Sequence, residues 1–463
     1  MSTRKEKDSM GEVSLPANAL YGATTQRAVE NFPISGRTFG GMFIKMFAEL
    51  KFAAAKTNLK LGKLDKKLAD AICKSADKVS KGGFDEHFPI DVFQTGSATS
   101  TNMNVNEVIA NLANVALGSA LGSKTPIHPN DHVNMGQSSN DTVPTVIHLS
   151  AAKKLRDELL PAVKKLKKEL NAKAKDFDDI LKIGRTHLMD ATPIRLGQEF
   201  SGFAYQIEIC EAALGKVLPS LYELAIGGTA VGTGINTHPK FAKEVCKVLS
   251  ERTGLPVIEA KNHFAAQASK DACVEVSGAL KTLAGALMKI ADDIRWMASG
   301  PRAGLAEIML PSLQPGSSIM PGKSNPVIPE VVTQVAVQVI ANDVAVTWGS
   351  SLGRLDLNTM MPLIAINLLD SIHLLTSACA VFADKCIKGL EADRKHCASL
   401  VERSLMLSTP LAPVIGYDKA AALAKKAFAE NKTIREVALE AKVLSAKELD
   451  KLLDVRSMTE PGE

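Results

Sequence analysis

Four polar segments of this 463-residue chain carry side chains that could act on a small anion. They span residues 94–107, 128–145, 184–193 and 314–330, and they are rich in Ser, Thr, Asn and Gly. Closely spaced hydroxyl, amide and backbone N–H donors can form a concave surface that binds an anion. Lys323 and His187 stand among these donors. This inventory predicts binding of a small polyanion and proton transfer upon it.

Each polar segment also has a simpler interpretation as a turn or a helix cap. Ser, Thr and Asn serve as caps and turn residues more often than as ligand-binding groups. Ser139, Asn140 and Asp141 precede a predicted helix and could merely cap it. The segments indicate a site because four of them occur together in one chain.

Metal and dinucleotide sites are disfavoured. His128 and His132 have the i, i+4 spacing of a zinc pair, but Pro129 disfavours a shared helix face and no cluster of Cys or carboxylates supplies further ligands. The glycines of residues 226–236 do not follow the G-x-G-x-x-G pattern. We therefore expect no metal and no cofactor.

Long helices must position these polar segments. The first 140 residues are mixed, and long amphipathic runs begin near Asp141. Residues 330–348 and 363–386 are apolar on more than one side, which is typical of helices buried by other helices. These runs predict a helical bundle that other subunits complete. The last 60 residues or so predict a smaller helical appendix.

The composition is that of a soluble globular protein, with 46% hydrophobic, 23% charged and 5% aromatic residues. The net charge of +5 is small, and the lysines of residues 153–170 follow the polar face of an amphipathic helix, so we expect no nucleic-acid partner. No apolar run approaches the roughly 18 residues of a membrane span, and the N-terminus lacks the apolar core of a signal peptide. Seven scattered cysteines without a CxxC spacing favour reduced thiols. We expect a cytoplasmic protein, with a mature organellar form left open.

The segment GSSIMPGKSNP (Gly316–Pro326) closely resembles the signature of the fumarase/aspartase superfamily. The resemblance extends over essentially the whole chain. The stretches QTGSATSTNMNVNEVIAN, HPNDHVN, GRTHLMDATPIRLGQE and GGTAVGTGINTHP look most like class II fumarate hydratases. Aspartases share the scaffold and most of these segments.

The resemblance implies a mainly α fold with three domains: a mixed N-terminal domain (1–140), a central bundle of long helices (141–395) and a small C-terminal helical domain (396–463). It also implies a homotetramer with a twenty-helix core, in which three chains contribute to each active site. The implied activity is the cofactor-free, reversible hydration of fumarate to (S)-malate through an aci-carboxylate, a step of the tricarboxylic acid cycle. Aspartate ammonia-lyase is the alternative in the same superfamily, and a non-catalytic helical scaffold is a third hypothesis.

Residue roles are carried over from the resemblance. Ser317 would be the catalytic base, or else one more anion-binding hydroxyl. His187, which read alone is a structural hydrogen bonder, would handle the water with Glu330 as its carboxylate partner. Lys323 and Asn325 would hold a substrate carboxylate. The remaining substrate-binding residues would be Ser97, Thr99, Ser138, Ser139, Asn140, Thr186 and Ser318.

Residues His128, Pro129, Asn130 and Asp131 match a second, non-catalytic dicarboxylate site of the fumarases. Three positions depart from the commoner pattern of the family. Ser324 stands where Val is usual, Ala98 replaces a Gly, and Gly136 replaces a Ser. None of these changes removes a predicted catalytic group, although Ser324 makes its segment more polar.

Overall fold

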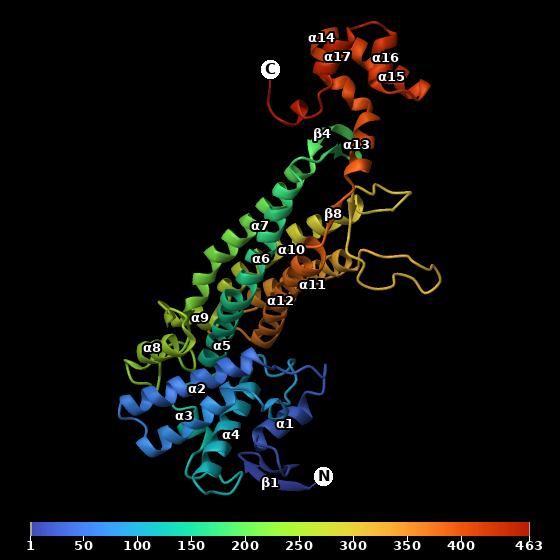
Figure 1. Ribbon diagram of the computed structural model, residues 1–463. Coiled ribbons are helices and arrows are strands. Elements are labelled where there is room, and N and C mark those ends of the chain that lie inside the picture. The colour runs from blue at the N-terminus through green and yellow to red at the C-terminus, as the bar shows by residue number, and fades with distance from the viewer. Residues whose placement is uncertain (1, 463) are drawn as a thin grey trace. The chain divides into compact units, whose positions relative to one another are not determined.

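The computed structural model describes residues 2–462 and is mainly helical, which confirms the predicted fold class (Figure 1). The chain divides into two compact units, each discontinuous in sequence. Unit 1 holds the residues up to Pro161 together with Ala212–Ala284 and Val337–Thr376. Unit 2 holds Ala162–Glu211, Gly285–Ala336 and the residues from Ser377 onward. The three-domain division stays a prediction.

Unit 1 is built from helices and two small sheets. Its antiparallel hairpin pairs β1 with β2, and β5 pairs with β6 in parallel. The elements are β1 (Thr3–Asp8), β2 (Gly11–Pro16), α1 (Ala23–Asn31), α2 (Met42–Lys60), α3 (Lys66–Ser80), α4 (Thr99–Ala116), α5 (Ser139–Lys154), β5 (Glu223–Leu224), α8 (Phe241–Thr253), β6 (Ile258–Glu259) and α9 (His263–Ala268).

Five long helices have residues in both units: α6 (Leu160–Asp176), α7 (Leu196–Val217), α10 (Asp271–Met297), α11 (Val327–Ser351) and α12 (Met361–Phe382). The remaining elements belong to unit 2: β3 (Leu181–Thr186), β4 (Met189–Arg195), β7 (Ile308–Met309), β8 (Glu391–Ala392), α13 (Arg394–Glu402), α14 (Ala412–Ile415), α15 (Tyr417–Glu430), α16 (Ile434–Glu440) and α17 (Ala446–Leu452). Here β3 pairs with β4, and β7 with β8, both antiparallel.

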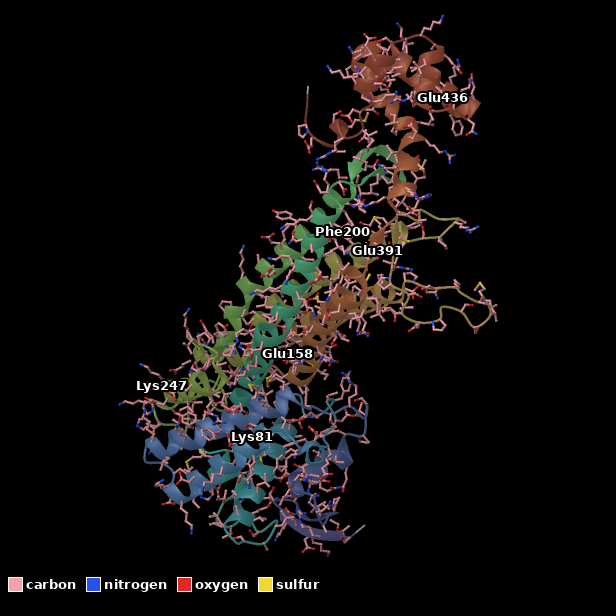
Figure 2. The ribbon with its side chains drawn as sticks, viewed as in Figure 1. Lys81, Glu158, Phe200, Lys247, Glu391 and Glu436 are labelled. Atoms are coloured by element: carbon pink, nitrogen blue, oxygen red, sulfur yellow. The ribbon has the colours of Figure 1, made fainter. Side chains whose placement is uncertain are left out.

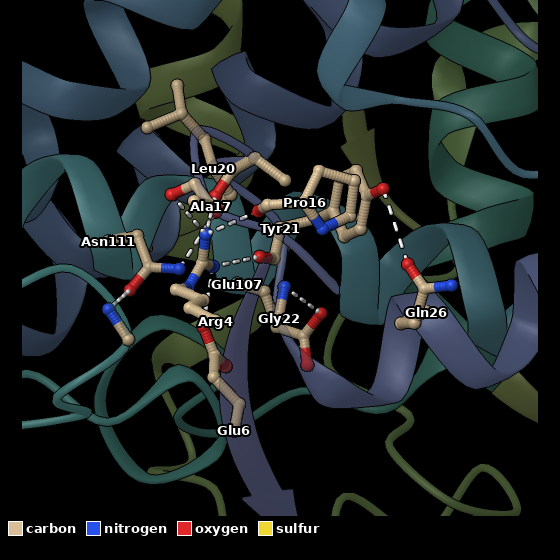
Figure 3. Close-up of polar contacts among 12 residues, drawn as sticks. Arg4, Glu6, Pro16, Ala17, Leu20, Tyr21, Gly22, Gln26, Glu107 and Asn111 are labelled. Atoms are coloured by element: carbon tan, nitrogen blue, oxygen red, sulfur yellow. Dashed lines mark hydrogen bonds and ion pairs between the residues drawn. The ribbon is translucent and has the colours of Figure 1, made fainter. Parts of the chain in front are cut away.

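Polar contacts that are partly or fully buried hold the N-terminal hairpin beside α4 (Figure 3). The Arg4 guanidinium donates to the carbonyls of Pro16 (3.0 Å) and Ala19 (2.7 Å). The buried Glu107 of α4 accepts the backbone N–H of Gly22 at 2.9 Å. Because buried polar groups need partners, these bonds define where the hairpin lies. They hold the segment around α4, the helix that begins at Thr99.

Aromatic contacts fill the core of unit 1 around α2. Phe43 stacks on Phe39 with ring centroids 4.3 Å apart and meets Phe47 edge-on at 5.3 Å. All three rings are buried. Such pairs stabilise a core beyond the apolar area that they bury.

Polar contacts join the long helices within unit 1. Asp343 of α11 is buried and accepts bonds from Ser277 (2.7 Å) and Lys281 (2.6 Å) of α10. Asn342 donates to Ser371 of α12 at 3.1 Å. These pairs fix the register of three helices whose other contacts are mostly apolar.

Unit 2 has its own aromatic core. Figure 2 labels Phe200 on α7. Its ring meets Phe177 and Phe203 edge-on, at 5.4 Å and 5.5 Å. A second cluster lies farther along the chain, where Leu423 of α15 and Ile434 of α16 pack with other buried residues between positions 407 and 453.

The expectation that no segment resembles a membrane span needs correction. Two stretches, Val327–Ser351 and Met361–Ile387, are long and apolar enough to cross a membrane by length and composition alone. Only 33% and 50% of their most apolar windows are buried within the chain. Core helices of soluble proteins pass the same test, so this is weak evidence for a membrane. Both helices therefore carry apolar residues that are not buried within this chain.

The seven cysteines form no disulfide, in agreement with the sequence prediction. Six of them are buried. Burial raises the pKa of the Cys273 thiol to about 12, which keeps it protonated and unreactive near neutral pH.

Candidate functional site

The predicted anion-binding hydroxyls of unit 1 lie together at the N-termini of two helices. Thr99 is the first residue of α4 and Ser139 the first of α5. Their hydroxyl oxygens are 2.7 Å apart, and Ser97 Oγ lies 2.7 Å from Thr99 Oγ1. Helix N-termini carry partial positive charge and free N–H groups, so two that converge favour an anion.

The turn before α5 combines a cap with the candidate site. Ser138 and Asp141 form a capping box, in which Asp141 accepts the backbone N–H of Ser138 at 2.9 Å. The cap interpretation is therefore correct for Asp141, whereas the cap residue itself is Ser138 and not Ser139 or Asn140. Ser139 is buried, yet its hydroxyl still faces Thr99. The cap fixes the turn that presents Ser139 and Asn140.

Asp141 also binds a segment that sequence reasoning did not connect to the site. Its other carboxylate oxygen accepts the backbone N–H groups of Gly227 (3.0 Å) and Thr229 (2.9 Å). Asn140 donates to the carbonyl of Ala230 at 2.8 Å. Burial raises the pKa of Asp141 to about 6, while the donated N–H groups act in the opposite direction. The glycine-rich segment 226–236 thus supports the α5 turn.

Two of the unusual positions differ in backbone strain. Ala98 precedes α4 with φ 51°, in the left-handed region that favours glycine. Gly136 has φ 72°, a conformation that glycine adopts without strain, and a Cβ there would meet only ordinary contacts. The Gly at 136 therefore suits its turn, whereas the Ala at 98 is strained.

The HPND segment forms a short π-helical turn over Pro129–Val133. His128 caps it, because its Nδ1 accepts the backbone N–H groups of Asn130 (3.2 Å) and Asp131 (3.4 Å). His132 Nδ1 accepts the backbone N–H of His128 at 2.8 Å. No group of three or more metal-ligating side chains occurs among residues 2–462.

In unit 2, His187 lies at the tip of the β3–β4 hairpin. Thr186 pairs with Met189, so His187 and Leu188 form a two-residue turn with φ values of 57° and 59°. Two positive φ values are expected for this kind of hairpin, but Asn and Gly usually supply them. His187 and Leu188 are exposed. Strain at a non-glycine tip is typical of functional sites.

Buried ion pairs stabilise the base of the β3–β4 hairpin. Glu307 has no exposure, and Arg185 donates to it at 2.8 Å. Lys182 Nζ lies 3.3 Å from Glu307 and 3.1 Å from Glu199. Removing one partner of such a buried pair would leave an uncompensated charge. The base of the hairpin is therefore rigid while its tip is exposed.

The segment 314–325 is closed at its base by its own hydrogen bonds. Gly316 donates its backbone N–H to the carbonyl of Lys323 at 2.8 Å, and Asn325 Nδ2 donates to the carbonyl of Gly316 at 2.7 Å. A Cβ at Gly316 would lie 2.6 Å from the Lys323 oxygen, so the close approach requires glycine. In this conformation the Asn325 amide is hydrogen-bonded within the segment and does not offer this N–H to a ligand.

Ser317 accepts two backbone N–H groups inside this segment. Ile319 and Met320 donate to its Oγ at 3.2 Å and 3.0 Å. Hydrogen bonds donated to an oxygen favour its charged form. Ser317 and Lys323 also line the same cavity of about 430 Å³. The exposed Ser324 has no hydrogen-bond partner among residues 2–462, and nothing in the structure explains it.

The predicted site residues are divided between the two units. Unit 1 carries the hydroxyls near Thr99 and the HPND turn, and unit 2 carries the rest. Glu330 lies in the first turn of α11. Within the described part of the chain its carboxylate forms no hydrogen bond or ion pair with His187. The members of unit 2 are Thr186, His187, Ser317, Ser318, Lys323, Asn325 and Glu330.

Comparisons with known proteins identify the family of the chain. Residues 11–341 match the lyase family, and residues 407–460 match the C-terminal domain of fumarase C. The fumarate hydratase class II of Mycobacterium tuberculosis (strain H37Rv) is 53% identical over 460 residues, covering 98% of this chain and 96% of that protein. The fumarate hydratase class II of Nitrosomonas europaea is 50% identical over 457 residues, covering 99% of each.

A crystal structure of class II fumarase from Schistosoma mansoni superimposes with a TM-score of 0.97 at 40% sequence identity, covering 100% of both chains. The chain therefore belongs to the class II fumarate hydratase family of lyases.

Proposed function

We propose that this enzyme catalyses the reversible hydration of fumarate to (S)-malate. The observation that carries the proposal is the Ser317 hydroxyl, which accepts two backbone N–H groups in a segment that also presents Lys323. Full-length relatives named fumarate hydratase class II support it. These relatives do not favour the aspartate ammonia-lyase alternative.

Dicarboxylate binding begins at the α4 and α5 N-termini. Thr99 and Ser139 offer hydroxyl donors there, and Asn140 and Ser138 lie in the same turn. Removing a proton next to a carboxylate adds negative charge to that carboxylate, so preorganised donors lower the barrier. Lys323 and Asn325 hold this carboxylate, for which Asn325 must release the carbonyl of Gly316.

In the dehydration direction, Ser317 as alkoxide takes the proton from the carbon next to one carboxylate. The electron pair of that C–H bond moves into the carboxylate and gives the aci-carboxylate. The pair then returns to form the double bond as the hydroxyl leaves the neighbouring carbon. His187 donates the proton that turns the leaving hydroxyl into water. Glu330 does not contact His187 within the described part of one chain, so in this proposal it comes from another copy and favours the charged imidazole. Hydration is the reverse.

We propose that other copies of the chain complete the site. Apolar side chains are exposed beside each catalytic element: Leu188 (61%) follows His187, and Ile319 (83%) follows Ser317 by two residues. Helix α11 exposes Val337, Val344 and Trp348 along one stripe. Apolar patches of this kind mark interfaces. A homotetramer in which three chains contribute to each site covers them.

Light scattering after size exclusion, in buffer without detergent, tests the assembly. We expect the mass of four chains. A chain that stays in solution only with detergent would instead support a membrane role for α11 and α12. A monomer with full activity would contradict the shared site.

The activity itself is tested by following fumarate absorbance with malate, and then with aspartate, as substrate. We expect turnover of malate without added metal or cofactor. Turnover of aspartate but not malate would overturn the proposal. No turnover of either by a correctly assembled tetramer would support a non-catalytic scaffold.

The HPND turn is proposed as a second dicarboxylate site. The exposed Asn130 and Asp131 lie on a short turn capped by His128. A cytoplasmic location and a place in the tricarboxylic acid cycle complete the proposal.

A further inference from the structure

A buried lysine lies behind the hydroxyls of unit 1. Lys51 of α2 has no solvent exposure. Its ammonium donates to Asn102 Oδ1 (2.8 Å), Gln137 Oε1 (2.9 Å) and Asn134 Oδ1 (3.0 Å). An ammonium has three N–H donors, so every donor has a partner. All three acceptors are neutral amides.

The acceptors of Lys51 belong to the two segments that present the anion-binding hydroxyls. Asn102 lies in the first turn of α4, three residues after Thr99. Gln137 immediately precedes Ser138, the cap of α5. One side chain from α2 therefore connects the beginning of α4 with the turn before α5. The same two segments meet at the 2.7 Å contact between Thr99 and Ser139.

The charge of Lys51 has no carboxylate in contact with it in the described part of the chain. The charged group that acts on it is Asp141, whose oxygens are occupied by backbone N–H groups. Burial lowers the pKa of Lys51 to about 7, and Asp141 acts in the opposite direction. Near neutral pH both the charged and the neutral form are therefore populated, and a dianion bound nearby favours the charged one. Burying an ammonium among neutral groups lowers the free energy of unfolding by roughly several kcal/mol, even when all of its hydrogen bonds are formed. If Lys51 only connected α4 with the turn before α5, an uncharged side chain could do the same.

We propose that Lys51 is a positioning residue for the dicarboxylate substrate, holding the α4 and α5 turns together and adding positive potential beneath them. The inference rests on the proposed function, because the anion it favours is the dicarboxylate. Lys51 does not touch the substrate. It acts through the helix N-termini that do.

Substitutions of Gln137 can separate the effect of the Lys51 charge from the effect of its hydrogen bonds. Gln137→Glu keeps an acceptor for Lys51 and adds a carboxylate that cancels its charge, whereas Gln137→Met removes the acceptor without adding charge. Both variants lose the bonds that Gln137 Nε2 donates to the carbonyls of Val133 (3.1 Å) and Met135 (3.2 Å), so this loss is common to the pair. We expect Gln137→Glu to raise KM for fumarate and Kd for succinate roughly tenfold, as expected for one charge acting on a dianion through protein. We expect a smaller change in kcat, and in Gln137→Met a smaller change in both constants.

Lys51→Met and Lys51→Arg complete the set, with Lys56→Met as control because Lys56 lies on the exposed side of the same helix. Lys51→Met should resemble Gln137→Glu, Lys51→Arg should recover part of the affinity, and Lys56→Met should match the wild type. If Lys51→Met does not fold, the two Gln137 variants decide. Equal KM and Kd for Gln137→Glu and Gln137→Met would overturn the proposal.

Succinate binding, measured by calorimetry, keeps this inference separate from the proposed reaction. A wild-type enzyme that binds succinate but does not hydrate fumarate would contradict the proposed function and still allow the Lys51 comparison. A wild-type enzyme that binds no dicarboxylate at millimolar concentration would overturn both.

Discussion

The two units present their predicted site residues in opposite ways. In unit 1, Thr99 and Ser139 lie in buried or half-buried turns whose polar groups already bind one another. In unit 2, His187 lies on an exposed, strained hairpin tip, and Ser317 lies in a segment closed only by its own hydrogen bonds. In unit 1 the polar groups are paired within the chain, whereas in unit 2 the hairpin tip remains exposed.

The difference indicates how one chain can assign substrate binding and proton transfer to different segments. A preorganised anion site needs fixed donors, which capped helix N-termini provide. A serine that must act as a base needs protection from water when the substrate is present, and a movable segment can supply it. The comparison predicts that changes in unit 1 act mainly on binding, and changes in unit 2 mainly on turnover.

The largest effect is expected in unit 2. Ser317→Ala and His187→Asn should each lower kcat by at least about a hundredfold, the usual scale for general acid–base groups. KM for malate should change far less, because the unit 1 donors remain. Steady-state kinetics measure both constants.

Ser312→Ala is the matched control, since Ser312 lies in the same loop, is exposed and has no proposed role. It should retain wild-type kinetics. Near-normal turnover by a Ser317→Ala protein of tetrameric mass would remove Ser317 from the role of base.

The next largest effect is expected in unit 1. Thr99→Val and Ser139→Ala should each raise KM roughly tenfold, because each removes a hydrogen bond to a charged ligand. The two changes should not be additive, since the hydroxyls contact each other at 2.7 Å. A double-mutant cycle on KM and kcat measures the coupling. Full additivity would mean that the two hydroxyls bind the ligand independently.

Hydrogen exchange should show the contrast directly. When malate is added, the amides of residues 316–325 should exchange about tenfold more slowly as this segment closes, whereas those of α4 should be slow throughout. Mass spectrometry of peptides from both regions checks this. Equal protection of both regions by malate would contradict the division into a fixed and a movable part.

The smallest effect tests the fixed turn before α5. Gly136→Ala should lower the free energy of unfolding by about 1 kcal/mol, because φ at this position is in the left-handed region. Gly40→Ala is the control, since it has open space and no positive φ, and it should change stability little. Urea denaturation at fixed protein concentration compares them. Equal stabilities would show that the turn adjusts without cost.

Much of the fold and of the unit 1 site follows from local sequence. The apolar runs predicted the long helices, and a cap was expected at Ser139, Asn140 and Asp141. The structure places the cap one residue earlier, at Ser138, with Asp141 as its partner. The contact between Thr99 and Ser139 became visible only in the structure. The roles of Ser317, His187 and Glu330 came from family resemblance and stay predictions.

Sequence reasoning could not find the contacts that depend on distant segments. Lys51 lies in an ordinary helical run, and nothing near it in sequence indicates that it reaches Asn102 and Gln137. The glycine pattern of Gly227–Ala230 and its family resemblance do not indicate that this segment binds Asp141 and Asn140. Buried partners of this kind come from tertiary packing, and no local pattern encodes them.

The bonds between Gly316 and the pair Lys323 and Asn325 make the intervening residues a small closed ring of backbone. Proline fixes φ, so Pro315 and Pro326 limit backbone rotation at the two ends of this ring. For protein engineering, the two closing bonds should be kept so that the ring retains its shape. Ring residues without a proposed catalytic role, such as Ile319 and Met320, are the positions to exchange for a longer or shorter diacid.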